Sequence, residues 1–129
     1  LKTAQVIPSL TIKAVKNETL EVWGNGDQGR AFLHVNDVCE AFILAIRSSI
    51  QGTIMIGPNK CTTVREIAEA LIRSKKTLSK NISYDTSKPV GDLGRFYDGN
   101  LAEDLLHWKP KVSLENGLEE LIDYIKENS

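Results

Sequence analysis

The stretch Gly24–Gly29, with the letters GNGDQG, lies between two short β-prone runs, LEVW at 20–23 and AFLHV at 31–35. Its spacing matches G-x-G-x-x-G, which closes on a pyrophosphate only where a strand precedes the glycines and a helix follows them. Here the following residues include the strand formers Phe32 and Val35. The glycines therefore predict a positive-φ turn that joins two strands in a hairpin, and they do not predict a cofactor-binding loop.

Several other segments carry the apolar spacing of amphipathic helices. Thr63 and Glu66 form a capping box, in which each side chain satisfies an exposed backbone donor, and Ser113 precedes the most regular apolar stripe of the chain. Asn36 or Asp37 is expected to cap another helix, which makes Asp37 a structural residue and not a catalyst. The predicted helices, about five in number, cover 8–16, 37–48, 64–71, 98–105 and 114–125.

Two further runs are predicted to be strands. TIMIG at 53–57 is continuously apolar and ends at Gly57-Pro58, as expected for an interior strand of a parallel sheet. NISYD at 81–85 is a weaker strand, and the Pro and Gly content of 86–95 indicates a loop. The sequence thus predicts a mixed α/β fold with a β-hairpin, short strands and about five helices.

Composition limits the classes of protein to which this chain belongs. With 129 residues, 41% of them hydrophobic and 26% charged, residues 1–129 are expected to form one domain or a fragment of one. A net charge of -1 provides no overall field for nucleic acid or an anionic membrane, so any anion site must be local. Cys39 and Cys61 lack metal-site spacing, so no metal site is predicted and a reducing cytoplasm is expected.

The ends of the chain and its hydropathy lead to two further expectations. No apolar run reaches the roughly eighteen residues that a membrane span requires, and no charged-then-apolar leader opens the chain, so a cytoplasmic protein is predicted. The first residue is Leu1, and an apolar segment is under way by Val6. This beginning suggests a piece of a larger chain.

Tyr84 and Lys88 match Tyr-x-x-x-Lys, a pair that supports proton transfer when a helix places both side chains on one face. Pro89 biases Lys88 away from helical angles, and the residues before Tyr84 are extended in character. The match is therefore interpreted as a coincidence, and no catalytic residue is assigned in this chain.

Several ordered segments together resemble the C-terminal, substrate-binding part of the extended short-chain dehydrogenase family, which comprises NAD-dependent nucleotide-sugar epimerases and dehydratases. The segments that carry the resemblance are VIP at 6–8, LEVWGNGDQGRAFLHVNDV at 20–38, TIMIG at 53–57, SKPVGDLGRFYD at 87–98 and LLHWKPKVSLENGLEELIDYI at 105–125. They cover nearly the whole chain in the family's order. The resemblance implies the C-terminal part of an extended Rossmann-type enzyme, without its cofactor glycines and its catalytic Tyr and Lys.

Carried over by position, the resemblance implies that Arg30 and Arg95 bind the diphosphate of a nucleotide sugar, with Trp23 and Val6 near its nucleoside end. A planar guanidinium presents paired donors to phosphate oxygens, which suits this role. Each Arg would otherwise be a solvated surface charge, and Trp23 is equally compatible with a hairpin aromatic that packs on the core. His34 and His107 have no partner cluster and are expected to be structural.

Two functions follow as hypotheses. In the first, the chain is the nucleotide-diphosphate-sugar-binding portion of an NAD- or NADP-dependent epimerase or dehydratase, whose cofactor is not expected to bind this chain alone. In the second, it is a stand-alone, non-catalytic module that binds a nucleotide sugar or another anion. The resemblance also implies a homodimer as an ordinary assembly, and it leaves open the base, the sugar and the reaction.

Overall fold

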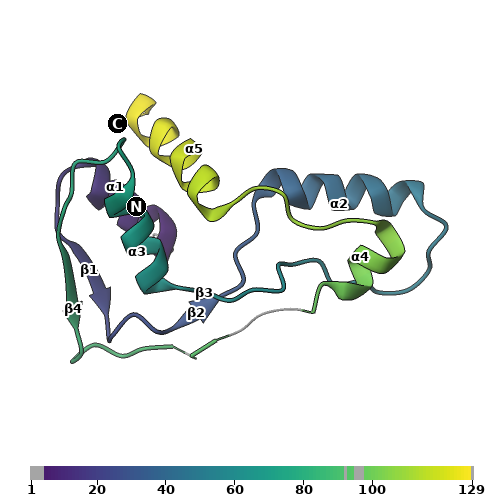
Figure 1. Cartoon of the computed structure of the whole chain (residues 1–129), viewed down its shortest axis with the longest axis horizontal. Coiled ribbons are helices and arrows are strands. Elements are labelled where there is room, and N and C mark those ends of the chain that lie inside the picture. The colour runs from purple at the N-terminus through teal and green to yellow at the C-terminus, as the bar shows by residue number, and fades with distance from the viewer. Residues whose placement is uncertain (1–4, 92, 95–97, 129) are drawn as a thin grey trace.

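The computed structural model describes residues 5–91, 93–94 and 98–128. Five helices and four short strands lie within this part, which confirms the predicted mixed α/β class (Figure 1). The helices are α1 (Val6–Val15), α2 (Val35–Arg47), α3 (Val64–Arg73), α4 (Asn100–Leu106) and α5 (Leu114–Glu127). The strands are β1 (Leu20–Trp23), β2 (Gly29–Arg30), β3 (Thr62–Thr63) and β4 (Ile82–Asp85).

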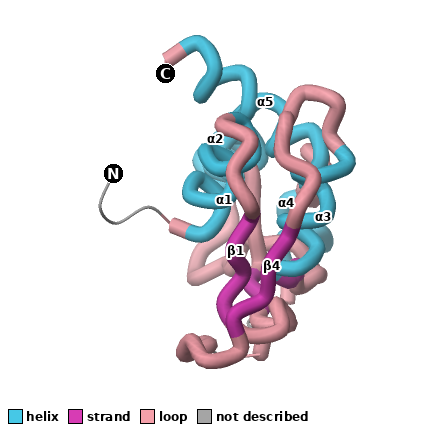
Figure 2. Tube along the Cα trace, turned by 90° about the vertical axis from the view of Figure 1, so that its left-hand side faces the viewer, coloured by secondary structure: helices cyan, strands magenta, loops and turns pink. Residues whose placement is uncertain are grey.

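The predicted hairpin is wrong, because β1 and β2 do not pair with each other. β1 pairs in parallel with β4, with Leu20 opposite Ile82 and Trp23 opposite Asp85, and Figure 2 shows the two strands side by side. β2 instead pairs antiparallel with β3. A Cβ atom at Gly29 would lie only 2.5 Å from the Cys61 sulfur, so the close approach of these two segments requires a glycine.

Two separate hydrophobic clusters lie within the described residues. The main core joins α1, α3 and α5 to β1 at one end of the molecule (Figure 1), and it contains Leu10, Ala14, Leu20, Val22, Ile67, Ala68, Ala70, Leu71, Leu118 and Ile122. A smaller cluster of Ala41, Ala102, Leu106 and Trp108 holds α2 against α4. Since β1 buries Leu20 and Val22, its alternate residues Glu21 and Trp23 face outward.

The predicted strand at 53–57 is also wrong, because none of its residues forms a strand within the described part of the chain. Ile54 and Ile56 pack against the smaller cluster, whereas Met55 is 51% exposed. An apolar run becomes a strand only when a neighbouring strand accepts and donates its backbone hydrogen bonds, and periodicity alone does not supply that neighbour.

Local capping signals identified two helix starts correctly. The Thr63–Glu66 capping box is present in both directions, and the Ser113 hydroxyl accepts a hydrogen bond from the backbone N–H of Asn116. The cap of α2 is a correction, since His34 occupies the position expected for Asn36 or Asp37 and its imidazole accepts from the Asn36 N–H.

Asp37 is structural, as expected, but in a different way. Its buried carboxylate accepts hydrogen bonds from the backbone N–H groups of Lys111 and Val112, each at 3.1 Å. The indole N–H of Trp108 donates to the Asp37 carbonyl at 3.0 Å. Asp37 therefore joins the start of α2 to the segment that leads into α5.

Candidate functional site

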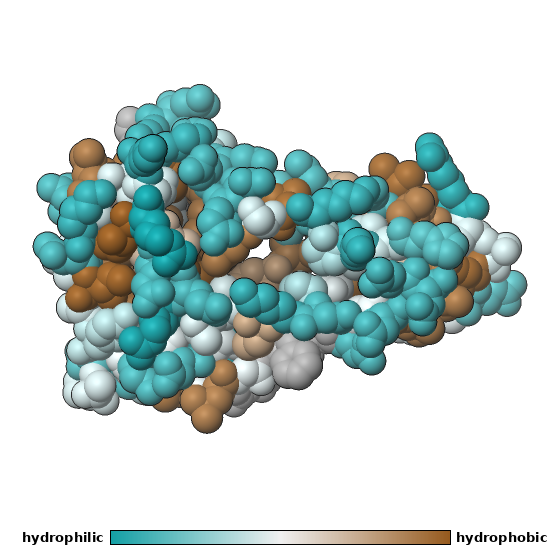
Figure 3. Space-filling model, in the orientation of Figure 1, coloured by the Kyte–Doolittle hydropathy of each residue, from teal (hydrophilic) through white to brown (hydrophobic). Residues whose placement is uncertain are grey.

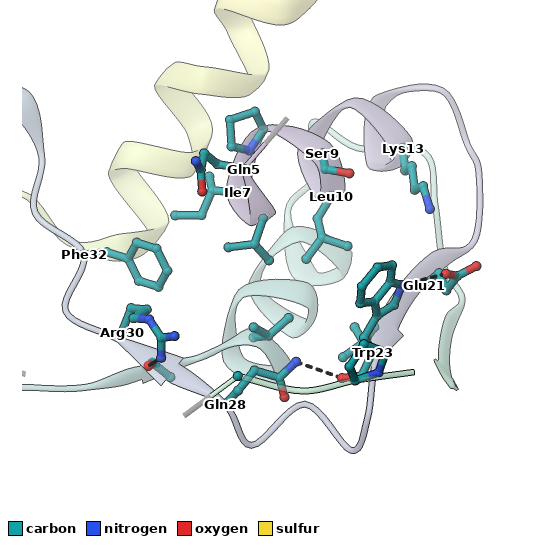
Figure 4. A pocket seen from close by; sticks show the side chains of 17 residues that line it. Gln5, Ile7, Ser9, Leu10, Lys13, Glu21, Trp23, Gln28, Arg30 and Phe32 are labelled. Carbon is teal, nitrogen blue, oxygen red and sulfur yellow. Dashed lines mark hydrogen bonds between the residues drawn. The ribbon is translucent and has the colours of Figure 1, made fainter. Parts of the chain in front are cut away.

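A groove of about 910 Å³ runs between α1, the outward face of β1 and the segment around β2 (Figure 4). Val6, Ile7 and Leu10 of α1 supply part of its apolar wall, and Phe32 supplies another part. Trp23, Glu21 and Lys13 lie at one end, and Arg30 lies at the other end beside Phe32. The groove thus combines an apolar wall with a few charged and aromatic groups, as small-molecule sites commonly do.

The structure brings together three of the four site residues predicted from the sequence. Val6, Trp23 and Arg30 all line this groove, although they come from α1, β1 and β2. The fourth, Arg95, lies outside the described residues. Gly91 also lines the groove, and a Cβ atom there would be 3.1 Å from Nη2 of Arg30.

The Arg30 side chain is exposed at the mouth of the groove. Its Nη1 donates a hydrogen bond to the carbonyl of Gly29 at 2.7 Å, which holds the guanidinium close to the backbone of β2. A guanidinium carries five N–H donors in a planar arrangement, which suits it to contacts with several acceptor oxygens. The absence of a side chain at Gly91 lets the backbone of the 89–91 segment approach Arg30 closely.

Trp23 is hydrogen-bonded through its indole and through its backbone. Its indole N–H donates to Oε1 of Glu21 at 3.0 Å, and its backbone carbonyl accepts from Nε2 of Gln28 at 2.8 Å. Nζ of Lys88 lies 5.9 Å from the ring centroid, within range of a weak cation–π contact. The indole is nevertheless 48% exposed, which leaves much of its surface available to a ligand.

The glycine segment forms a turn and not a phosphate-binding loop. Gly24 and Gly26 have φ angles of 68° and 83°, which confirms the predicted positive-φ turn. The first N–H groups of α3 are bonded to this turn, from Arg65 to the Gly26 carbonyl and from Val64 to the Gln28 carbonyl, each at 3.0 Å. Backbone donors that would serve an anion at a helix N-terminus are thus already used within the protein.

The Arg65 side chain strengthens the contact between the glycine turn at 24–29 and the start of α3. It donates to the Asn25 carbonyl, lies 3.4 Å from the Asp27 carboxylate, and stacks over Tyr84 with 4.9 Å between the guanidinium carbon and the ring centroid. Tyr84 lies in β4 and Lys88 in the following turn, which confirms that their Tyr-x-x-x-Lys spacing is not helical. The two residues contact different partners, Arg65 and Trp23.

The sequence did not point to most of the other residues that line the groove, among them the polar residues Lys13, Glu21 and Gln28. The period of two in β1 would have placed Glu21 beside Trp23, since residues at i and i+2 share one face of a strand. No sequence signal pointed to Gln28, whose position depends on the contact between the glycine turn and α3. Its side-chain oxygen is buried and has no hydrogen-bond partner in the described part of the chain.

Other site types are not evident in the described residues. No group of three or more His, Cys, Asp and Glu residues there is arranged to hold a metal ion. His34 has a structural position, since it caps α2 and lies 3.2 Å from Glu120 of α5. Within the described ranges, no helix combines the length and hydrophobicity that crossing a bilayer requires.

Apolar side chains also lie exposed on α2, away from the groove. Phe42, Ile43 and Ile46 are 60%, 48% and 83% exposed. Figure 3 shows apolar surface gathered near the C-terminal end of this helix. Soluble proteins rarely leave several large apolar side chains together in water, so this face is suited to contact with further protein.

Comparison with known proteins identifies relatives across nearly the whole chain. Residues 2–121 match the protein family described as GDP-mannose 4,6 dehydratase. GDP-L-fucose synthase 1 from Arabidopsis thaliana is 34% identical over 112 residues, which are 86% of this chain and 34% of that protein. UDP-glucuronic acid decarboxylase 1 from Danio rerio is 30% identical over 97% of this chain and 29% of its own length.

A solved structure gives the same result for the fold. UDP-glucuronic acid 4-epimerase from Bacillus cereus, in complex with UDP-glucuronic acid and NAD, superposes with a TM-score of 0.82 at 26% identity. The match covers 97% of this chain and 40% of that protein. The chain therefore spans well under half the length of these relatives.

Proposed function

Because the chain belongs to the GDP-mannose 4,6 dehydratase family, we propose that it is the portion of an NAD-dependent nucleotide-sugar epimerase or dehydratase that binds the nucleotide-diphosphate sugar. The match to the extended short-chain dehydrogenases confirms the resemblance in the sequence. Its relatives act on different sugars by different reactions, as their names state. The shared feature that we transfer is therefore recognition of a sugar linked to a nucleoside diphosphate.

One observation carries the proposal, namely that a single groove contains a guanidinium at one end and an exposed indole at the other. Arg30 is proposed to bind the diphosphate, with Trp23 and Val6 at the nucleoside. Arg95 is proposed to bind the same diphosphate, on sequence grounds alone. A volume of about 910 Å³ lies within the range that ligand pockets commonly have.

The energetics are consistent with this assignment. Charge-assisted hydrogen bonds contribute about 1.5 to 3 kcal/mol each. The loss of one guanidinium that makes such a contact should therefore weaken binding by about tenfold or more. The overall charge of -1 does not attract anions, so affinity for a diphosphate must come from local groups such as Arg30.

The NAD named in the Bacillus cereus structure is proposed to bind outside the portion that this chain matches. The one glycine motif that fits by spacing has its neighbouring α3 donors bonded to Gly26 and Gln28, so it does not fit a pyrophosphate. Neither Tyr84 nor Lys88 lies on a helix. We therefore derive no hydride-transfer step from the residues of this chain.

The alternative function is a stand-alone module that binds a nucleotide sugar and catalyses nothing. Both hypotheses predict binding in the groove, and they differ in whether the exposed apolar face of α2 packs against further protein. The size of that face favours the first hypothesis, since Phe42 and Ile46 are more than half exposed.

Isothermal titration of this chain with GDP and UDP tests the binding proposal. Arg30→Ala is expected to weaken the affinity for both diphosphates by about tenfold or more, and Arg30→Lys to give an intermediate loss, because Lys keeps the charge without the paired donors. Arg47→Ala is the matched control, since Arg47 is exposed at the end of α2 and does not line the groove. Equal affinities of Arg30→Ala and wild type would contradict the assignment.

A further inference from the structure

The tryptophan end of the groove carries a carboxylate and an ammonium group as well as the indole. Glu21 and Trp23 occupy alternate positions of β1 and are both exposed, and the indole N–H donates to Oε1 of Glu21 at 3.0 Å. Lys13, in the last turn of α1, lines the same end, and Figure 4 shows its side chain directed toward that of Glu21. A ligand at this end thus meets an aromatic surface, an acceptor and a donor.

The carboxylate is held in place while keeping acceptor capacity. An ionised carboxylate has about four lone-pair sites, and the Trp23 N–H uses one of them. The bond to Trp23 restricts the Glu21 side chain to one rotamer, so this side chain loses little further conformational entropy when a ligand binds to it. Gln28 fixes the Trp23 backbone from the other side at 2.8 Å.

The nucleobases differ in how their edges match this pattern. Guanine presents the O6 acceptor beside two adjacent donors, the N1–H and the N2 amino group, and two adjacent donors suit one carboxylate. Uracil presents an N3–H flanked by carbonyl oxygens, so one of its oxygens would face the carboxylate. Adenine places an acceptor, N1, where guanine has a donor.

We propose that Glu21 and Lys13 read the edge of guanine, with Glu21 accepting from N1–H and the amino group and Lys13 donating to O6, while the base lies against Trp23. The groove then selects a GDP-linked ligand over a UDP-linked one. This inference rests on the proposed function, because it assumes that the nucleoside occupies the tryptophan end.

Titrations with GDP, inosine diphosphate and UDP test this reading. Inosine diphosphate keeps O6 and N1–H and lacks only the amino group. Wild type is expected to bind GDP about tenfold or more tightly than either alternative, the loss expected for a hydrogen bond to a charged acceptor. In Glu21→Gln, which keeps an acceptor for Trp23 but loses the charge, these preferences are expected to fall to about threefold or less.

Two further variants sharpen the comparison. Glu18→Gln makes the same chemical change at an exposed residue outside the groove, so it should keep the wild-type preferences. Lys13→Met should weaken GDP and inosine diphosphate by the same factor, since both carry O6. Using ratios between ligands removes any general effect of the altered charge on diphosphate binding.

The possible failures are distinguishable. If wild type binds the three nucleotides equally, or if Glu21→Gln keeps the preference for GDP, the guanine reading is overturned while an Arg30-dependent affinity still supports the proposed function. If none of the three nucleotides binds, the proposed function fails, and this inference fails with it.

Discussion

Replacing Asp37 by Ala should remove the main polar contact between the start of α2 and the segment before α5. The carboxylate is 2% exposed and accepts from the backbone N–H groups of Lys111 and Val112, at 3.1 Å each. Hydrogen bonds to a charged group contribute about 1.5 to 3 kcal/mol each, and both donors are only partly buried, so water partly replaces the lost acceptor. We expect the free energy of unfolding to fall by about 3 kcal/mol.

Urea denaturation followed by tryptophan fluorescence measures this loss. Trp108 is 1% exposed and its indole N–H donates to the main-chain carbonyl of Asp37, which the substitution leaves in place. With an m-value of about 1.5 kcal/mol/M, the midpoint should fall by about 2 M. Asp37→Asn keeps one acceptor oxygen, so about half of the effect is expected.

Asp104→Ala is the matched control, because Asp104 is exposed on α4. Its substitution should change stability by no more than about 0.5 kcal/mol. The reasoning is refuted if Asp37→Ala and Asp104→Ala unfold at the same urea concentration. That result would mean that water replaces the hydrogen bonds of the Asp37 carboxylate without loss of stability.

Two further predictions concern the glycine turn and the capping box. Gly24→Ala should lower stability more than Gly52→Ala in thermal unfolding: both residues have positive φ, but a Cβ at Gly24 would meet Val90 at 2.2 Å, whereas one at Gly52 has no neighbour within 4 Å. Equal losses would show that only backbone strain matters. The backbone N–H of Thr63 lowers the pKa of Glu66 below its ordinary value, assisted by the Thr63 hydroxyl and Lys60 and opposed by burial. A carboxyl group whose pKa is lower in the folded state stabilises the fold at pH values above its unfolded-state pKa. This stabilisation is lost as the pH falls through the folded-state pKa. Any advantage of wild type over Glu66→Gln should therefore be present near pH 7 and vanish at acid pH, and an advantage that grows on acidification would contradict the assignment.

The site illustrates which functional residues a sequence can reveal. Arg30, Trp23 and Val6 were identified by resemblance to a family, and they line one groove because α1, β1 and β2 meet there. The position of Glu21 beside Trp23 could have been predicted from the alternation of buried and exposed residues in β1. The position of Gln28 could not be predicted in this way, since it follows from hydrogen bonds between the glycine turn and α3, which lie far apart in the sequence.

The helices and the glycine turn could be predicted from the amino-acid sequence, because their causes lie within a few residues. The Thr63–Glu66 capping box, the Ser113 cap and the positive φ of Gly24 and Gly26 depend on contacts between near neighbours, and each was predicted correctly. Their physical basis is the local satisfaction of backbone donors and the steric freedom of glycine.

Which strands pair, and which groups Asp37 binds, depends on the packing of segments that are distant in the sequence. Leu20 pairs with Ile82, and Asp37 accepts from Lys111 and Val112, across 62 residues of chain in the first case and over 70 in the second. A β-prone run needs a partner strand, and a buried carboxylate needs hydrogen-bond donors. The local sequence does not indicate which distant segment supplies the strand or the donors. That choice is made by the packing of the whole chain, since only then do these backbone groups meet.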